Sequence, residues 1–579
     1  MKYSCALSME ELEKRTHKDY LLEKIMLDVD SVEFQNLKDG DKLALSYLVK
    51  AARIIEKINM ELDSHHNLAF KKYLEDEIKK GNKQAQLTKI LFDAQKGIFA
   101  LDCESNLVKL ASGLDKRKGR GFYPDDLDEA EFHAILIKMI KEGKINSVKK
   151  ILNQRSVVER NGDELVAIDY VDKFKEDFEK TAQLLLKASC VSTNADFNEY
   201  LRLQADAFMK ADSMLDAYAD KKWASLQDTP LEFTITRENY SDEMTETVLE
   251  NKELAELLKE NNIDVISKDY LGARIGIVNK EGTNYILKVK DFLPLMAKNM
   301  PYCDKYEQVI GGDSEISQTM VDVDLIEVAG DVGAFRAGIT LAENLPNNDK
   351  LSLTIGGGRR NVYHRQIRFV TSEDAKKKIQ ERLDNILVKD LHKYYDDTMD
   401  HPFTIGHENG HSLGPKEGCE ALGKYKSIIE ENKADMVSLS MLDVLTNAGL
   451  YTKEEKEKII VTYQADNMLK SKPELTQAHR VRSVMQNYYF IKNGAIEIDN
   501  YGFLNIHIDK MVATAQKMLA EIVEVQMSGD FSKGEKYVLD NFIWTDEMEV
   551  VAKKLRKISK RLNGKTIQKL ADKLFREEI

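Results

Sequence analysis

The hydrophobic period of the sequence changes twice along the chain, and these changes limit the folds open to it. Up to about residue 228 apolar residues recur at helical spacing, as in the stripe Leu48, Ala51, Ala52, Ile55, Ile58 and Leu62. Between about 231 and 370, runs such as LEFTITR, ARIGIVN and LIEVAGDV are rich in β-branched residues and separated by turn residues. Helical spacing returns after about 373, and within the strand-rich stretch only 286–300 looks helical, with Pro294 as a boundary. Because the chain has 8 prolines and 30 glycines in 579 residues, helix breakers are few, and the sequence predicts a mostly helical α+β protein.

Charge and apolar content exclude several classes of function. The 85 basic and 98 acidic residues give a net charge of -13, which disfavours general polyanion binding because phosphate neutralisation needs a basic surface. No run of eighteen apolar residues occurs, and MKYSCALSMEELEKR has too short an apolar run for a secretory signal. The five cysteines are far apart and form no CxxC pair. We therefore expect a cytoplasmic protein that binds neither nucleic acid nor membrane.

The last thirty residues, VVAKKLRKISKRLNGKTIQKLADKLFREEI, are basic and amphipathic. They predict a helical, solvated face that partly offsets the acidic remainder. The alternative interpretation is a nucleic-acid or membrane-surface helix. Salt-sensitive binding to nucleic acid would distinguish the two.

The strongest chemical signal is the segment His407-Glu408-Asn409-Gly410-His411. Histidines four residues apart share one face of a helix, so both imidazoles can bind the same Zn²⁺ ion. The glutamate after the first histidine is then placed to act on a water at the metal. A chance match is the competing interpretation of this motif taken alone.

A zinc site of this type needs a third protein ligand and a group that orients a histidine. Glu431 follows His407 by 24 residues, and Asp435 lies four residues beyond it on the same helical face. This is the spacing of thermolysin-like zinc peptidases. Glu430 is the competing ligand candidate, but its i+4 partner is Ala434, which cannot orient anything. The other competing interpretation is a solvated, charged helix face.

The amino-acid sequence around these residues resembles that of the dipeptidyl peptidase III family. HENGHSLGP followed by EENKAD matches the zinc motif and the EExxAE-type segment of that family. The resemblance continues, in family order, through GRGFYPDDLDEAEF, ERNGDELVAIDYVDKFKEDFEKTAQLL, FNEYLRLQADAF, ENYSD, ARIGIVNK, ENLPNND and QAH. It covers most of the chain.

The resemblance implies a role for five further residues. Glu238 and Tyr240 resemble the family's Glu-x-Tyr, and Asn344 and Asn347 resemble its asparagine pair, which together hold the free amino end and backbone of a peptide. His479 resembles the histidine that donates to the tetrahedral oxyanion. The simpler alternatives are that Asn347 forms a turn, that Tyr240 belongs to the core and that His479 is structural.

The sequence also departs from the family pattern in two places. The best-known members have one more residue between the two histidines, whereas a standard helix accommodates the shorter HExxH directly. The family arginine expected four residues after the oxyanion histidine is replaced by Ser483, with Arg480 and Arg482 nearby but out of register. The anchoring of the carboxyl side of the substrate, and with it the preferred peptide length, is therefore open.

The resemblance implies two lobes around a wide cleft. Residues 1–285, 325–372 and 541–579 would form a mixed lobe with a small β-barrel, and residues 286–324 and 373–540 would form the helical, zinc-binding lobe. The strand-rich stretch from 231 to 370 agrees with this expectation.

The resulting hypothesis is a zinc exopeptidase that releases dipeptides from the amino end of short peptides by metal-activated water. One Zn²⁺ per chain would be held by His407, His411 and Glu431, with Glu408 as the base and Asp435 orienting a histidine. The alternatives are a zinc endopeptidase or other amide hydrolase, and a peptide-binding protein without turnover. The sequence gives no role to His392 or His401, predicts a surface position for His65-His66 and a turn at Gly356-Gly357-Gly358, and leaves the oligomeric state open.

Overall fold

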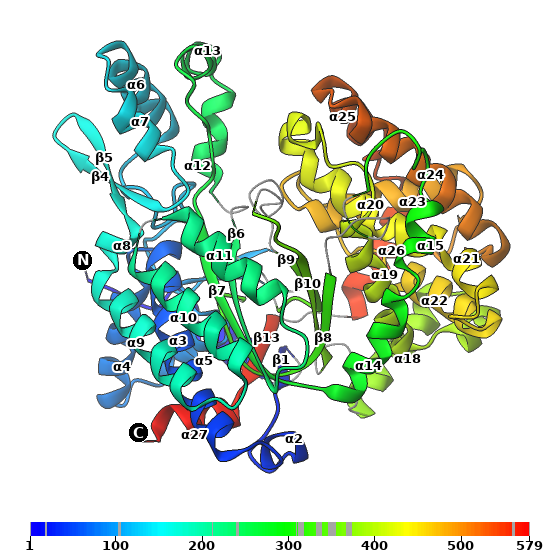
Figure 1. Ribbon diagram of the computed structural model, residues 1–579, viewed down its shortest axis with the longest axis horizontal. Helices are drawn as coiled ribbons and strands as arrows, with labels where there is room; N and C mark the ends of the chain where they lie inside the picture. The colour runs from blue at the N-terminus through cyan, green and yellow to red at the C-terminus, as the bar shows by residue number, and fades with distance from the viewer. Residues whose placement is uncertain are drawn as a thin grey trace.

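The computed structural model shows a mostly helical α+β protein with one five-stranded sheet (Figure 1). In Figure 1 this sheet lies between a group of helices from the first half of the chain and a second group from the later part. The structure describes residues 2–17, 20–101, 106–210, 212–238, 242–308, 310, 318–331, 339–345, 355–365, 373–558 and 562–577.

The part before the sheet is helical, as its apolar spacing predicts. The whole stripe from Leu48 to Leu62 is buried on α3 (Asp39–Asp63), which packs against α9 and the sheet. The other helices are α1 (Met9–Thr16), α2 (Val32–Gln35), α4 (Asn67–Lys79), α5 (Lys83–Gln95), α6 (Glu129–Lys141), α7 (Ile145–Ile151), α8 (Tyr170–Lys173), α9 (Lys175–Val191), α10 (Ala195–Met209) and α11 (Ser213–Ala224). Two hairpins accompany them, β2 (Phe99–Leu101) with β3 (Leu107–Lys109) and β4 (Ser156–Asn161) with β5 (Glu164–Asp169).

The strand-rich stretch forms one mixed sheet in the order β6-β7-β8-β10-β9. β8 and β10 run parallel, and the other neighbours are antiparallel. The strands are β6 (Leu231–Glu238), β7 (Tyr270–Val278), β8 (Gln318–Ala329), β9 (Ala342–Leu345) and β10 (Arg359–His364). The helices α12 (Glu243–Glu246) and α13 (Lys252–Glu260) lie between β6 and β7 in the chain.

This sheet is open where it is described, so the expected small barrel is not confirmed. β6 and β9 are its two edges, and no closed barrel occurs among the described residues. A closed barrel requires pairing between the first and last strand. Alternating strand runs predict strands and their faces, whereas closure depends on twist and on pairings between distant segments.

The later part of the chain is a second group of helices. It consists of α14 (Lys280–Lys290), α15 (Leu293–Lys298), α18 (Glu373–Ile386), α19 (Asp400–Ser412), α20 (Lys426–Ser440), α21 (Leu442–Asn447), α22 (Lys453–Asp466), α23 (Ala478–Lys492), α24 (Ile508–Ser528), α25 (Phe531–Asn541) and α26 (Asp546–Ile558), with the hairpin β11 (Ile496–Ile498) and β12 (Leu504–Ile506). Pro294 stands in the first turn of α15, at the helix boundary where it was expected. Within the described ranges, no helix is both long and apolar enough to cross a bilayer.

Buried apolar side chains gather in separate clusters. The largest joins α3, α6, α9 and α10 to the sheet, and includes Leu570 and Leu574 near the end of the chain. A second cluster is built almost wholly from the later helices, from Ile286 to Leu555. The boundaries of the two lobes remain a prediction.

The first and last parts of the chain meet beside the sheet. β1 (Leu21–Ile25) pairs in parallel with β13 (Leu562–Ile567), and α27 (Lys569–Arg576) packs on α3. The guanidinium of Arg53 contacts both Glu327 of β8 and Asp572 of α27, at 2.7 and 2.8 Å. The basic C-terminal segment therefore includes a helix docked on the first core by its apolar face.

Candidate metal centre

Two helices of the later group approach closely along a seam of small residues. Gly406 and Gly410 of α19 face Ser438 and Ala434 of α20. A β-carbon at position 410 would lie 2.8 Å from the carbonyl oxygen of Ala434 and 2.9 Å from its α-carbon. A β-carbon at position 406 would collide with Ser438. The glycines therefore permit a helix separation that alanine would prevent.

This close approach brings His407 and His411 of α19 to Glu431 of α20. The Nε2 atoms of the two histidines lie 3.1 Å apart. Oε2 of Glu431 lies 3.5 Å from Nε2 of His407 and 3.9 Å from Nε2 of His411. In the part of the chain that is described, these three residues form the one group of potential ligand atoms within 4.8 Å of one another.

The donor set fits a zinc ion. Two imidazole nitrogens at about 2.0–2.1 Å from a tetrahedral Zn²⁺ would lie about 3.3–3.4 Å apart, close to the observed separation. Oε2 of Glu431 is buried and makes no regular hydrogen bond within the described residues, although Nδ1 of the exposed His479 lies 3.1 Å away. Burying a carboxylate oxygen without such a bond is costly. A cation held by the three residues would remove that cost.

Each histidine has a carboxylate on its other ring nitrogen. Oδ1 of Asp435 lies 2.7 Å from Nδ1 of His407, and Oε1 of Glu430 lies 3.1 Å from Nδ1 of His411. An ionised carboxylate only accepts, so each Nδ1 carries the proton and each Nε2 presents its lone pair to the site. Carboxylates of this kind orient metal-binding histidines.

Glu430 is the member of this set that the sequence analysis missed. It was considered only as a rival ligand, whereas the structure places it behind His411. Its charge is balanced by Lys433 at 2.8 Å, and the amide of Gln526 donates to its Oε2 at 2.9 Å. The adjacent pair Glu430-Glu431 could have indicated this role. Adjacent residues of a helix point about 100° apart, so the two side chains can reach different sides of a neighbouring ring.

Two lysines, the half-buried Lys416 and the buried Lys433, complete the end of the histidine helix. Nζ of Lys416 donates to the carbonyl of His411, and Nζ of Lys433 donates to the carbonyl of Leu413, both at 2.6 Å. Lysines at a helix C-terminus donate to carbonyls that have no partner within the helix. Their positive charge also interacts favourably with the helix dipole. Gly414, with φ of +92°, and Pro415 then end α19.

The electrostatics of the site favour a neutral His407 beside an ionised Glu431. Burial lowers the pKa of His407. Burial would raise the pKa of Glu431, but His479, His411 and His407 outweigh it and hold that pKa well below its ordinary value. Burial raises the pKa of Glu408. Neutral imidazoles and a charged carboxylate are the forms that bind metal.

His479 lies at the open side of this group, in the first turn of α23. Its side chain is 68% exposed, and its Nδ1 is 3.1 Å from Oε2 of Glu431. The structure thus brings His479 to the metal-ligand group. Ser483, one turn later, donates to the carbonyl of His479.

Only part of the expected peptide-binding set lies within the described residues. Glu238 ends β6, and Tyr240 and Asn347 lie outside the described residues. Asn344 is buried on β9, where its Nδ2 donates to Asn361 and, at 3.3 Å, to Oγ of Ser412. Nδ2 of Asn361 donates to Asn409 at 3.3 Å. These amides join the edge of the sheet to the histidine helix.

The remaining histidines of the sequence analysis lie elsewhere. His392 contacts Leu387 and Asp384, and His401 is buried near the start of α19 against Tyr363. His65 and His66, for which a surface position was predicted, both contact Asp125 at 3.2 Å. Only His65 is well exposed.

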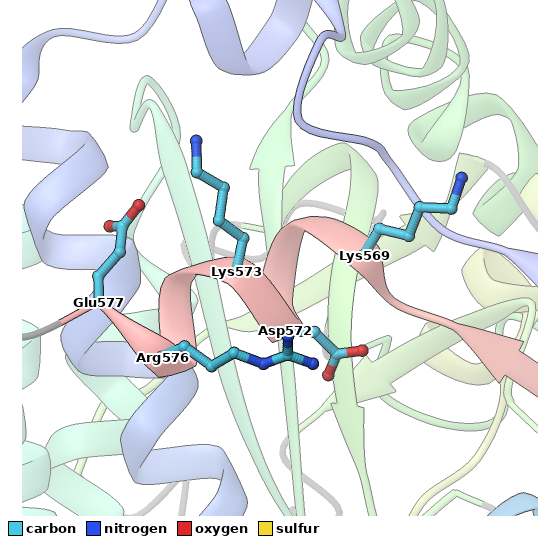
Figure 2. Close-up of a pocket in the computed structure, with 5 residues that line it drawn as sticks. All are labelled: Lys569, Asp572, Lys573, Arg576 and Glu577. Atoms are coloured by element: carbon cyan, nitrogen blue, oxygen red, sulfur yellow. The ribbon is translucent and has the colours of Figure 1, made fainter.

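A shallow pocket lies on α27, away from the histidine helix (Figures 1 and 2). Figure 2 shows the charged side chains of α27 that line it, which are Lys569, Asp572, Lys573, Arg576 and Glu577. In this view Lys569, Lys573 and Glu577 point in different directions, and the five side chains do not converge on one point. Among the described residues, the metal-ligand group is therefore the better candidate for chemistry.

Comparisons with known proteins bear on the fold of the chain. No protein-family model matches the sequence. Nudix hydrolase 3 of Arabidopsis thaliana is 24% identical over 552 residues, which cover 85% of this chain and 66% of that protein. The structure of dipeptidyl peptidase III from Caldithrix abyssi matches 96% of this chain and 99% of its own, with a TM-score of 0.76 and 22% identity. That of dipeptidyl-peptidase III from Corallococcus sp. strain EGB matches 95% and 96%, with a TM-score of 0.75 and 21% identity.

Fold and site together define a protein with a candidate metal centre on two packed helices. The chain has the dipeptidyl peptidase III fold. The chain matches 66% of the length of its curated relative, so the name of that relative describes a longer protein.

Proposed function

We propose that the chain is a zinc-dependent exopeptidase that releases dipeptides from the amino end of short peptides. The observation that carries the proposal is the His407-His411-Glu431 group, in which both histidines are oriented by carboxylates. The dipeptidyl peptidase III fold supports a peptidase. We further propose a cytoplasmic enzyme with one zinc ion per chain and two lobes divided as the sequence analysis sets out.

His407, His411 and Glu431 would hold the zinc ion. When bound, it would supply a Lewis acid that polarises a carbonyl group and lowers the pKa of water. Glu408 would transfer the protons, and His479 would stabilise the negative charge that develops on the substrate.

Glu408 would act as the general base. It is buried beside the ligand group, and burial raises the pKa of its carboxyl, which makes the carboxylate a stronger base. Its carboxylate would take a proton from the attacking water and return it to the leaving amine. His479, which is exposed at the mouth of the group, would donate a hydrogen bond to the oxyanion.

Selectivity for the amino end would come from residues away from the metal. Glu238, Tyr240, Asn344 and Asn347 would hold the free ammonium group and the first peptide bonds, as the family resemblance implies. Because this anchor would leave room for two residues before the metal, the product would be a dipeptide. Asn344 already lies beside Ser412, at the end of the histidine helix.

A peptide library analysed by mass spectrometry tests the proposal. The zinc-loaded chain should release dipeptides successively from the amino end, and Glu408→Gln should retain zinc while losing about 10²–10⁴-fold in rate. Fragments from within peptides would indicate an endopeptidase. Zinc binding without any cleavage would indicate a peptide-binding protein and would contradict the enzyme proposal.

A second variant tests the amino-end anchor separately. Glu238→Ala should lower the rate on dipeptidyl substrates while leaving zinc binding unchanged, because the residue would bind the substrate ammonium rather than the metal. An unchanged rate would overturn the anchor and leave a zinc hydrolase with a different mode of substrate binding.

A further inference from the structure

The two carboxylate oxygens of Asp435 have different partners. Asp435 is fully buried on α20, and its Oδ1 faces His407. Its Oδ2 accepts hydrogen bonds from the hydroxyl of Tyr463 and the amide of Gln486, both at 3.0 Å, and from Nη1 of Arg482. Among the described residues, Arg482 is the one cation bonded to Asp435. Because a buried carboxylate is costly without a cation, this arginine is central to the group.

We propose that Arg482 is a positioning residue that holds Asp435, and through it the imidazole of His407, in the orientation needed for metal binding. The inference rests on the proposed zinc site. Arg482 itself lies behind Asp435 and would touch neither the metal nor a peptide.

The arrangement on the other histidine supports this assignment. His411 is backed by Glu430, and Glu430 is backed by Lys433. Each imidazole is therefore followed by one carboxylate and then by one cation, of which Lys433 is buried and Arg482 is 17% exposed. The two cations differ in origin, because Lys433 belongs to α20, whereas Arg482 comes from α23.

The position of Arg482 on α23 follows from helical geometry. Arg482 lies three residues after His479, so both side chains can face α20 from the same side of their helix. Arg480 points elsewhere, and its guanidinium donates to the carbonyl and hydroxyl of Ser471 at 3.1 and 2.9 Å. Arg480 is therefore a matched control on the same helix.

A purely electrostatic role for Arg482 would have the opposite effect on metal binding. Burial lowers the pKa of Arg482 to about 10, so the side chain is still a cation at neutral pH, and it lies near Glu431. Removing a positive charge near the site would strengthen the binding of Zn²⁺ by Coulomb's law alone. Removing a positioning residue should weaken it. The sign of the change separates the two roles.

The experiment measures zinc affinity by competition with a chelator for the full-length chain and its variants. Arg482→Met should weaken zinc binding about tenfold, the lower end of the range for residues that support metal ligands. Arg482→Lys, which keeps the charge but loses the planar fork, should lie between Arg482→Met and the wild type. Arg480→Met should bind zinc like the wild type.

A double variant keeps the test valid if Arg482→Met alone does not fold. Asp435→Asn with Arg482→Met removes both buried charges together, which proteins tolerate better than the loss of one partner. If Arg482 acts through Asp435, the double variant should bind zinc as Asp435→Asn does. A further tenfold loss in the double variant would overturn the proposal.

The experiment distinguishes a failure of the positioning role from a failure of the proposed function. Equal or tighter zinc binding by a folded Arg482→Met, beside a wild type that binds zinc, would overturn the positioning role alone. A wild type that binds no zinc would overturn the proposed function and this role with it. Absorption spectra of the cobalt-loaded wild type and Arg482→Met should also differ, because they report the geometry of the ligands rather than overall stability.

Discussion

Glu430 and Glu431 are neighbours in the chain, yet they contact opposite edges of the same imidazole. Oε1 of Glu430 lies 3.1 Å from Nδ1 of His411, whereas Oε2 of Glu431 lies 3.9 Å from its Nε2. One carboxylate therefore orients the ring, and the other faces the lone pair that a metal would use. Two adjacent, chemically identical side chains acquire different roles from the direction in which α20 presents them.

Substitution should separate these two roles. Glu431→Gln should remove most of the zinc affinity because a charged ligand is lost, whereas Glu430→Gln should weaken binding about 10–100-fold, as expected for a group that orients a ligand. Metal content and chelator competition measure both. Equal affinities for the two variants would contradict the assignment of different roles.

Removal of the metal should lower the thermal stability of the chain. Zinc at about 100 times its dissociation constant would contribute about 2.7 kcal/mol to the free energy of unfolding. Calorimetry before and after treatment with a chelator would measure the loss as a fall in Tm. His407→Asn should show no such fall, and His392→Asn, outside the ligand group, should respond like the wild type.

Gly410→Ala tests the close approach of α19 and α20. The added methyl group would lie 2.8 Å from the carbonyl oxygen of Ala434, so the helices must move apart. We expect a loss of about 1–3 kcal/mol in the free energy of unfolding, together with weaker zinc binding because Glu431 recedes from the histidines. Urea unfolding and zinc titration would test this, and an unchanged zinc affinity would show that the helix separation does not set the site.

The zinc-free chain should lose stability in mild acid. Burial lowers the pKa of His407 below its ordinary value of 6.5. The unfolded chain then binds a proton that the folded chain does not, so this contribution is fully present above pH 6.5 and is lost as the pH falls toward the lowered value. The free energy of unfolding, measured with urea between pH 7.5 and 5.5, should fall less in His407→Asn than in the wild type.

The sequence patterns predicted those features of the fold and the site that depend on residues close together in the chain. The histidines were placed on one helix face by their spacing, Asp435 was placed by its i+4 relation to Glu431, and the structure brings these residues together. The strand runs LEFTITR and ARIGIVN fall in β6 and β7. Helical and strand periods are encoded within a few residues, which is why they can be predicted from one sequence.

Features that depend on how distant elements meet were not predictable. The contact of Glu430 with His411 depends on how closely α19 and α20 pack. The contact of Arg482 with Asp435 depends on how α23 is rotated relative to α20. Asn344 was expected to hold a peptide, and in the structure its side chain contacts Asn361 and Ser412. Closure of the sheet into a barrel depends likewise on pairings between distant strands.

The parallel pair of β1 and β13 has a consequence for how the chain reaches its native state. Leu21 and Leu562 are paired across more than 500 residues, so this strand pair forms only after both segments are present. The helices of the second core lie within one later stretch of the chain, so their contacts span fewer residues than the β1–β13 pair, and contacts nearer in sequence form faster. During synthesis, the helices that carry the histidines can therefore assemble before β1 acquires its partner, because β13 follows these helices in the chain.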